Sequence, residues 1–277
     1  MSRALAVFHG RFGRATVYQL NRPFNMHAHR EGHLIFHVGG TPARIDVCED
    51  RWLLTENSIV AINPWEPHNF VPTDMDNGAI FFVLYVNAEW FAPDAMRAHG
   101  LRFGKTYFQR TAALDRHIRR TAALVCGAPS LSGLDCELRQ LIDGCYEESW
   151  QTDERPQETQ EARAASVTDF RVRKSIKLMS ESLGAELELD LIARESGLSR
   201  PHFYRLFRTQ TGVTPHLYLN TLMMEQALDA LVATEAPIAD IGFDLGFSSQ
   251  SGFTRFFAAN VGMAPTEYRR AAKVLRP

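Results

Sequence analysis

The chain has 277 residues, of which 45% are hydrophobic and 22% are charged, and its formal net charge is −2. These values are ordinary for a globular protein with room for two domains, and they exclude a disordered or fibrous chain. The small net charge also excludes nucleic-acid binding through a broadly basic surface, so a DNA-binding face would have to be a local feature.

Neither the N-terminus nor the cysteines point to an exported or membrane protein. No long apolar segment follows Met1, and the most apolar run, residues 79–86, is too short to span a bilayer. The four cysteines are scattered without a C-x-x-C pair, so we predict neither a disulfide framework nor a thiolate zinc site. A protein of the bacterial cytoplasm that does not contact membranes is expected.

The first 150 residues are predicted to form a β-rich domain that ends in helices. Segments 44–54 and 80–86 are short and β-prone, and clusters of Gly, Pro, Asn and Asp lie between such segments. Residues 22–39 resemble the first cupin motif, H-x-H-x3-E-x6-G, with His33 where glutamate is usual, and residues 63–68 (NPWEPH) resemble the second. This resemblance implies a small cupin-like β-barrel that senses a ligand.

A metal site is one interpretation of the histidines in these two motifs. Neutral imidazoles are common ligands of zinc, nickel, copper and iron, and His27 and His29 are predicted to point the same way on one strand. The candidate metal ligands are His27, His29, His33 and His68, with Glu31 and Glu66 as alternative oxygen ligands. The possible cofactor is therefore a divalent metal ion.

An organic effector is the other interpretation of the same histidines. They would then line a pocket, with Trp65, Trp52 and Phe70 as flat surfaces on which a sugar or aromatic effector could stack. Isolated aromatic side chains are more often part of the core. The sequence leaves both occupants of the barrel open.

Two amphipathic helices are predicted between the β-rich segment and residue 150. Leu114, Ile118 and Val125 form one apolar face, and residues 134, 138, 141, 142 and 145 form another. These faces either pack on the β domain or form the seam of a homodimer, and the sequence does not separate the two. Residues 151–166 are polar and charged, contain a proline, and are predicted to be an interdomain linker.

The region after the linker, residues 167–277, is predicted to be helical and contains an internal repeat. The pattern Phe203-x-Arg205-x-Phe207-x4-Gly212-x2-Pro215-x2-Tyr218 recurs fifty residues later as Phe253-x-Arg255-x-Phe257-x4-Gly262-x2-Pro265-x2-Tyr268. Six matched residues at fixed spacing indicate a duplicated module. In each copy a short helix, a turn glycine (Gly197 or Gly246) and a second helix predict a helix-turn-helix.

The outer face of the second helix in each module carries side chains suited to DNA. Arginine fits guanine O6 and N7, and glutamine fits adenine N6 and N7. The predicted DNA-binding residues are Arg200, His202, Tyr204, Arg205 and Arg208 in the first module, and Ser249, Gln250, Ser251, Thr254 and Arg255 in the second. A helix of about 18 residues between the modules spans roughly 27 Å, which brings two successive major grooves within reach.

Residues 170–272 resemble the C-terminal domain of the AraC/XylS family of transcription regulators. The matching signatures are Ile192-Ala193 with Gly197-Leu198-Ser199, then Gly246-Phe247-Ser248-Ser249, and Gly262-Met263-Ala264-Pro265-x2-Tyr268-Arg269. The resemblance implies base contacts from Arg200, Tyr204 and Arg205, and from Gln250, Ser251 and Arg255. Pro201 departs from the family pattern, because it is tolerated in a first helical turn but lacks the larger contacting side chain that often stands there.

The expected fold is α+β and multidomain: a cupin-like β-barrel with following helices (1–150), a linker (151–166) and an all-α double helix-turn-helix domain (167–277). We expect a sequence-specific transcription regulator, not an enzyme. Its expected partners are double-stranded promoter or operator DNA, an unknown small-molecule effector, a second copy of the chain and RNA polymerase. Two other functions stay open, a metal-dependent cupin enzyme and a DNA-binding protein whose barrel only dimerises, although no catalytic constellation supports the first.

Overall fold

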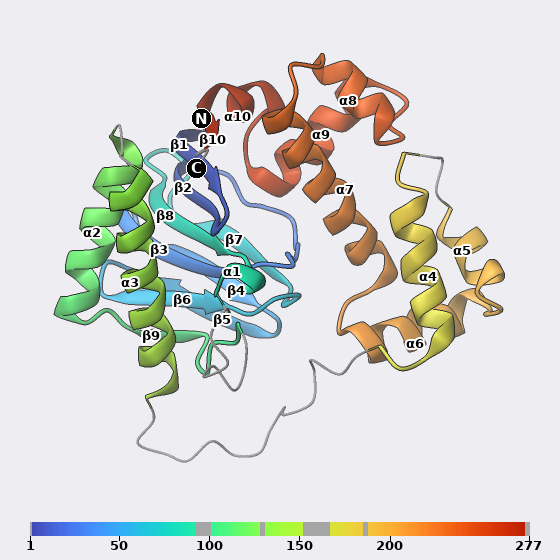
Figure 1. The fold of residues 1–277 in the computed structure, drawn as a ribbon, viewed down its shortest axis with the longest axis horizontal. Helices are drawn as coiled ribbons and strands as arrows, with labels where there is room; N and C mark the ends of the chain where they lie inside the picture. The colour runs from blue at the N-terminus through green and yellow to red at the C-terminus, as the bar shows by residue number, and fades with distance from the viewer. Residues whose placement is uncertain (1, 92–100, 128–130, 152–166, 185–187, 275–277) are drawn as a thin grey trace. The chain divides into compact units, whose positions relative to one another are not determined.

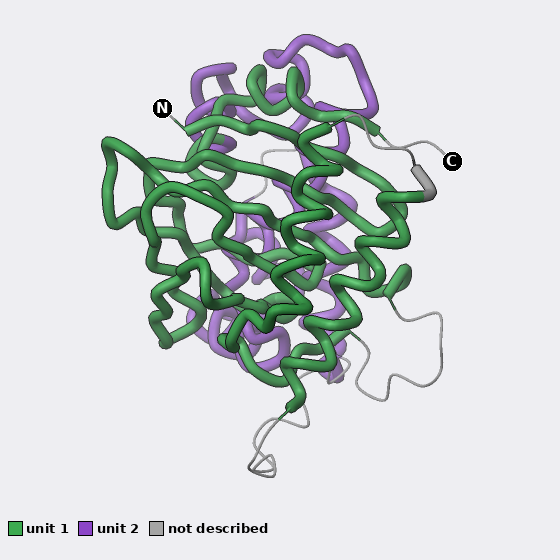
Figure 2. Tube along the Cα trace, turned by 90° about the vertical axis from the view of Figure 1, so that its left-hand side faces the viewer, with its two compact units in different colours: residues 1–151, 258–277 green, residues 152–257 purple. Residues whose placement is uncertain are grey.

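The structure is a computed structural model that describes residues 2–91, 101–127, 131–151, 167–184 and 188–274. The chain divides into two compact units, which we call unit 1 (residues 1–151 and 258–277) and unit 2 (residues 152–257), shown in Figure 2. The last twenty residues therefore pack with unit 1, whereas the sequence placed them with the helix-turn-helix domain. Apart from residue 151, the predicted linker lies outside the described residues.

Unit 1 is built on two β-sheets (Figure 1). The larger has the strand order β10-β1-β2-β8-β3-β6-β9, and the smaller has the order β5-β4-β7. The strands are β1 (Arg3–Gly10), β2 (Gly13–Leu20), β3 (Gly32–Gly40), β4 (Ala43–Val47), β5 (Asp50–Leu54), β6 (Ser58–Ile62), β7 (His68–Pro72), β8 (Ala79–Val86), β9 (Tyr107–Gln109) and β10 (Ala272–Val274). In the part of the chain that is described, the ladders do not close into one continuous barrel, so the cupin-like domain consists of two separate sheets.

One predicted β segment, 44–54, is a hairpin rather than a single strand. Cys48 adopts a φ of 54° between β4 and β5, and the two strands pair from Val47↔Asp50 to Ala43↔Leu54. A left-handed residue is uncommon outside glycine and is a feature of tight turns. The apolar and β-branched composition of the segment identified its extended conformation but not the turn.

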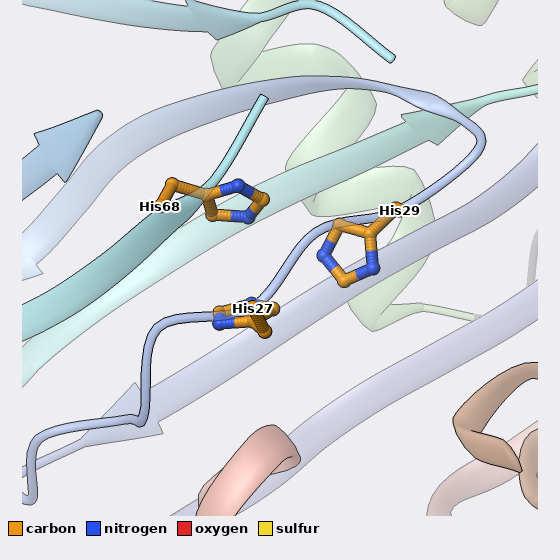
Figure 3. A group of neighbouring side chains, drawn as sticks. All are labelled: His27, His29 and His68. Carbon is orange, nitrogen blue, oxygen red and sulfur yellow. The ribbon is translucent and has the colours of Figure 1, made fainter. Parts of the chain in front are cut away.

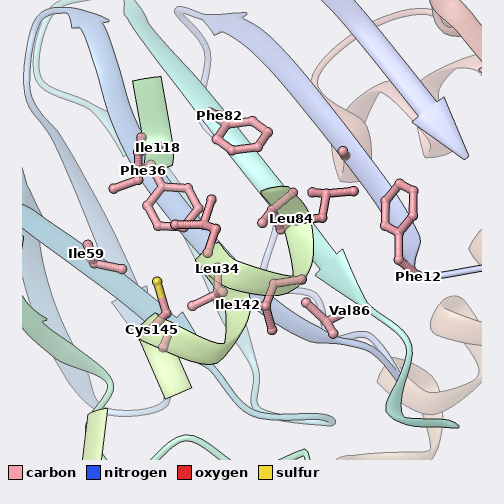
Figure 4. Close-up of a cluster of buried hydrophobic side chains, with 14 of the residues drawn as sticks. Phe12, Leu34, Phe36, Ile59, Phe82, Leu84, Val86, Ile118, Ile142 and Cys145 are labelled. Atoms are coloured by element: carbon pink, nitrogen blue, oxygen red, sulfur yellow. The ribbon is translucent and has the colours of Figure 1, made fainter. Parts of the chain in front are cut away.

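One face of the larger sheet is covered by helices α2 (Ala112–Cys126) and α3 (Leu131–Trp150), as Figure 4 shows. Alternate residues of β8, namely Phe82, Leu84 and Val86, share a buried apolar cluster with Ile118 and Ile142 of these helices. Burying such side chains stabilises the fold by about 1.5–3 kcal/mol each. The apolar faces predicted for the two helices are therefore packed on the β domain, the first of the two alternatives.

The opposite face of the larger sheet carries polar and aromatic side chains at one end. The strand registers pair His9 with Arg14, Arg14 with Tyr85, and Tyr85 with His33, across β1, β2, β8 and β3. We call these four residues the polar row. Because burying polar groups without hydrogen bonds is costly, a row of this kind is unusual for a purely structural surface.

The C-terminal segment belongs to the same sheet. After helix α10 (Pro265–Ala271), strand β10 runs parallel to β1, with Val7 opposite Ala272 and His9 opposite Val274. Tyr268 of α10 is fully buried. The sequence placed Tyr268 in the repeat, but its contacts with unit 1 were not predicted.

The described residues of unit 2 form helices and no strands, and no helix described in either unit is long and apolar enough to cross a membrane. The helices are α4 (Phe170–Glu181), α5 (Leu189–Glu195), α6 (Arg200–Thr211), α7 (Pro215–Ala233), α8 (Ile238–Asp244) and α9 (Gln250–Val261), which ends in unit 1; α1 (Ala88–Phe91) lies in unit 1. Helix α4 packs on α5 and α6, and α7 packs on α8. Gly197 (φ 72°) and Gly246 (φ 83°) form the two predicted turns.

Candidate DNA-binding and effector sites

The two helix-turn-helix modules have matching cores. Phe203 and Phe207 of α6 are fully buried, as are Phe253 and Phe257 of α9, so the second helix of each module has one buried aromatic face. In the second module the crossing with α8 is tight, because a Cβ added at Gly242 would lie 2.9 Å from the Cβ of Phe253. The repeated phenylalanines therefore form the inner face of both helices.

The outward face of α6 is basic, and one of its arginines forms an ion pair. Arg205 and Arg208 are exposed and form no ion pair with any residue in the described ranges, whereas Arg200 pairs with Asp190 at 3.2 Å. His202 and Tyr204 are half-buried. An ion pair between exposed groups contributes little, about 0–1 kcal/mol, so Arg200 can exchange it for a phosphate. Pro201 lies in the first turn and leaves the helix intact.

The outward face of α9 is mostly uncharged. Gln250, Ser251 and Arg255 are exposed, and Thr254 is half-buried. Ser249 has a second role, because its Oγ accepts a hydrogen bond from the backbone N–H of Gly252 at 3.2 Å and so caps the helix. At the equivalent position before α6, Ser199 makes no such bond. Ser249 thus supports the helix from which its neighbours project.

Three of the four predicted histidines form one group, shown in Figure 3. One ring nitrogen from each of His27, His29 and His68 lies within 4.8 Å of those of the other two. His27 and His68 exchange backbone hydrogen bonds of 2.9 and 2.8 Å. The prediction that His27 and His29 lie on a strand was wrong, because this segment pairs with β7 through a single bridge. The backbone nevertheless brings the side chains together.

His33 and the two glutamates differ from the prediction. His33 lies on β3 beside the group, and its Nδ1 is 3.1 Å from Nε2 of His68. Glu66 accepts hydrogen bonds from the backbone N–H of Asn63 at 2.9 Å and from its Nδ2 at 3.1 Å, so its carboxylate stabilises a turn, and it is not part of the histidine group among the described residues. Glu31 is not in the histidine group either, as far as the described residues show.

Hydrogen bonds and burial fix the chemical form of these histidines. Nδ1 of His27 donates to the carbonyl of Asn25 at 2.8 Å, and Nδ1 of His68 donates to the carbonyl of Glu66 at 2.9 Å, which leaves each Nε2 with its lone pair. Burial lowers the pKa of His27 to about 4 and those of His29 and His68 well below the usual range. Neutral imidazoles with free lone pairs are the form that binds a metal ion.

The predicted aromatic residues lie in different environments. Trp65 adopts a φ of 66°, and its N–H donates to the carbonyl of His29 at 2.8 Å, so it adjoins the histidine group. Trp52 stacks on Tyr107 with 4.9 Å between ring centroids. Phe70 is buried and contacts Phe81 edge-on. A backbone hydrogen bond thus links Trp65 directly to His29 of the histidine group.

Sequence reasoning missed a second cluster, centred on Arg14 of the polar row. Its guanidinium carbon lies 3.6 Å from the ring centroid of Tyr85, and Nη1 donates to the Tyr268 hydroxyl at 3.3 Å. The same hydroxyl is 2.8 Å from Nε2 of His9. Alternation on β2 places Arg14 on the face opposite Ala15 and Val17, and a charged residue in such a pattern is expected to face solvent, so the pattern did not indicate its burial. No local pattern could have paired it with Tyr268.

Comparisons with known proteins cover both units. Residues 14–142 match the family described as AraC-like ligand binding domain, and residues 192–271 match the family described as Helix-turn-helix domain. Regulatory protein SoxS of Salmonella typhimurium is 35% identical over 98 residues, which are 35% of this chain and 92% of SoxS. HTH-type transcriptional activator RhaS of Escherichia coli is 32% identical over 92 residues, 33% of each chain.

Solved structures of ToxT of Vibrio cholerae have a similar fold over most of the chain. An apo ToxT variant superposes with a TM-score of 0.57 at 17% identity, over 93% of this chain and 96% of that one. A ToxT structure with bound unsaturated fatty acid has the same TM-score at 16% identity, over 92% and 94%. The two matched families, the duplicated helix-turn-helix and the SoxS match over nearly its whole length establish that this chain belongs to the AraC/XylS family of transcription regulators.

Proposed function

We propose that the chain reads two successive major grooves with α6 and α9 and that a small ligand bound in unit 1 controls this reading. The observation that carries the proposal is the exposed, repeated face of the two helices. Arg205 and Arg255 occupy the same position of the repeat, and both are exposed beside a fully buried phenylalanine core. Exposed guanidiniums on the second helix of a helix-turn-helix are suited to base edges and phosphates.

The proposal includes partners and excludes turnover. SoxS and RhaS are described as a regulatory protein and a transcriptional activator, which supports a role in transcription regulation. Contact with RNA polymerase at a promoter is part of the proposal. A homodimer would place four reading helices on one operator. Since α2 and α3 bury their predicted apolar faces within the chain, a dimer would have to use other surfaces.

A selection of random duplex DNA with the full-length chain tests the DNA reading. We expect one enriched motif per chain, with two specified segments centred about 10 base pairs apart, because the two helices must enter successive major grooves. A genome-wide binding map should then find the same motif in promoters. A dimer predicts two copies of the motif in each site. Enrichment of no sequence, or of one specified segment alone, would contradict the proposal.

For the ligand site, we propose that His27, His29 and His68 bind a divalent metal ion such as zinc. The donor set fits, because the three ring nitrogens converge and carbonyl partners hold two of the rings in the tautomer whose Nε2 carries the lone pair. A metal at Nε2 of His68 would replace its contact with Nδ1 of His33. Bound metal would supply a fixed positive charge that can orient an effector. The organic ligand in ToxT supports the alternative that the histidines line an organic pocket.

Zinc titration is expected to distinguish these occupants. The chain should bind one zinc ion, and zinc at 100 times its dissociation constant should stabilise it by about 2.7 kcal/mol in a thermal-shift assay. His29→Ala should weaken zinc binding by about tenfold or more, because it removes one of three ligands. His216→Ala is the matched control, since this histidine is exposed on α7 and distant in sequence from the group. Equal zinc affinity in all three proteins would exclude the metal site and favour an organic pocket.

A further inference from the structure

Arg14 is a buried cation without a buried anion. Its exposed fraction is 5%, and no carboxylate among the described residues lies within ion-pair distance of it. Its Nε is buried and has no hydrogen-bond partner in the described part of the chain. Since removing one partner of a buried charge pair is strongly destabilising, a permanently unpaired guanidinium at this position calls for a functional explanation.

The surroundings of Arg14 do not neutralise it. Burial lowers the pKa of His9 to about 3 and raises those of Tyr85 and Tyr268, so all three are neutral. The half-buried carboxylate of Glu31 acts on Arg14 through space only. The cluster therefore carries one net positive charge.

Other buried polar atoms in the same cluster also lack partners. Nε2 of His33 and the hydroxyl of Tyr18 are each buried without a hydrogen bond of good geometry in the described residues. The ring of His33 stacks on that of Tyr85 with 4.4 Å between centroids, and the guanidinium of Arg14 lies over the same Tyr85 ring, so both residues contact one ring. Buried polar groups in native proteins normally have a protein, water or ligand partner.

We propose that Arg14 is the anchor for a carboxylate group of the small-molecule effector. One carboxylate balances the single charge of the cluster, and its two oxygens accept hydrogen bonds from a guanidinium, whose fork of N–H groups matches them. A phosphate, with nearly two charges at neutral pH, would leave an excess negative charge beside neutral rings. This inference rests on the proposed function, since it names the chemistry of the ligand that unit 1 senses.

The anchor also adjoins the C-terminal segment. Nη1 of Arg14 holds the Tyr268 hydroxyl of α10, and α10 follows α9 after a single turn. A carboxylate that takes Nη1 would compete with this hydroxyl, whereas one bound at Nε would leave it in place. In either geometry, the side chain of Arg14 connects the effector's carboxylate to Tyr268 of α10.

The test uses acetate as the probe and acetamide as its neutral isostere, at constant ionic strength set with sodium chloride. In the wild-type chain labelled with nitrogen-15 at arginine, we expect the Arg14 Nε–Hε resonance to shift saturably with acetate and not with acetamide or chloride. The apparent affinity for acetate, obtained from the acetate-dependent rise in melting temperature, should be about tenfold lower in Arg14→Gln. Arg14→Lys, which keeps the charge, should retain part of this affinity. Arg51→Gln, at an exposed position on β5, is the matched control.

Each outcome has a defined meaning. Equal shifts with acetate and acetamide, or acetate binding by a folded Arg14→Gln chain that matches the wild type, would overturn the proposal. The wild-type resonance titration decides the question even where Arg14→Gln does not fold. DNA selection with the wild-type chain is independent of this measurement, so failure of the proposed DNA reading and failure of the carboxylate site give different results.

Discussion

Replacing Phe203 with alanine is expected to lower the free energy of unfolding of unit 2 by about 3–5 kcal/mol and to abolish specific DNA binding. Phe203 is fully buried, and its ring centroid is 5.6 Å from that of Phe207 and 5.9 Å from that of Tyr204. The substitution leaves a cavity between α5 and α6 that the surrounding helices can fill only in part. Denaturation followed by the helical circular-dichroism signal, together with DNA titration, measures both effects.

Phe170→Ala is the matched control for this experiment. Phe170 is the same residue type in the same unit, but it is 68% exposed on α4. Its truncation should change the free energy of unfolding by no more than about 0.5 kcal/mol and leave DNA binding intact. Similar losses in both variants would mean that Phe203 is not the centre of the module's core.

Arg205→Ala and Arg255→Ala are each expected to cost about 1–3 kcal/mol at one base position and to relax the preference there. Both arginines are exposed at the same position of the repeat, so each should act within its own half of the site. Binding selection with each variant gives the position that loses information. Arg119→Ala is a suitable control, because Arg119 is exposed on α2 of unit 1 and pairs with Asp115.

The opposite result for the two arginines is equally clear. A variant that binds all sequences more weakly by the same factor, with a smaller dependence of affinity on salt, would assign that arginine to a phosphate. The absence of any effect from Arg255→Ala would indicate that α9 contributes through its amide and hydroxyl groups alone. That outcome would agree with the lower charge of its outer face.

The two helix-turn-helix modules could be predicted because their signals are local. A turn glycine with positive φ follows α5 and α8, and prolines stand in the first turns of α6 and α7. Each of these features depends on a few neighbouring residues. The internal repeat gave a second, independent indication of the same two modules. The resemblance to a known family then supplied the function.

The sites of unit 1 were only partly predictable because they depend on pairing between distant strands. The motifs identified four candidate histidines, three of which form the group, but did not show that Glu66 is engaged by Asn63. Arg14 and Tyr85 become neighbours through strand register, which no short pattern specifies. The same holds for the two sheets, since alternation within a strand does not say which strand lies beside it.

The parallel pairing of β10 with β1 bears on how the chain is made. Val7 and Ala272 lie opposite each other in the sheet, although almost the whole chain separates them. During synthesis, β1 leaves the ribosome long before β10 and stays an open sheet edge until β10 emerges, and open edges favour pairing with other chains. Translation that stops short of β10 would therefore release a chain whose DNA-reading helices are nearly complete but whose N-terminal sheet is left prone to aggregation.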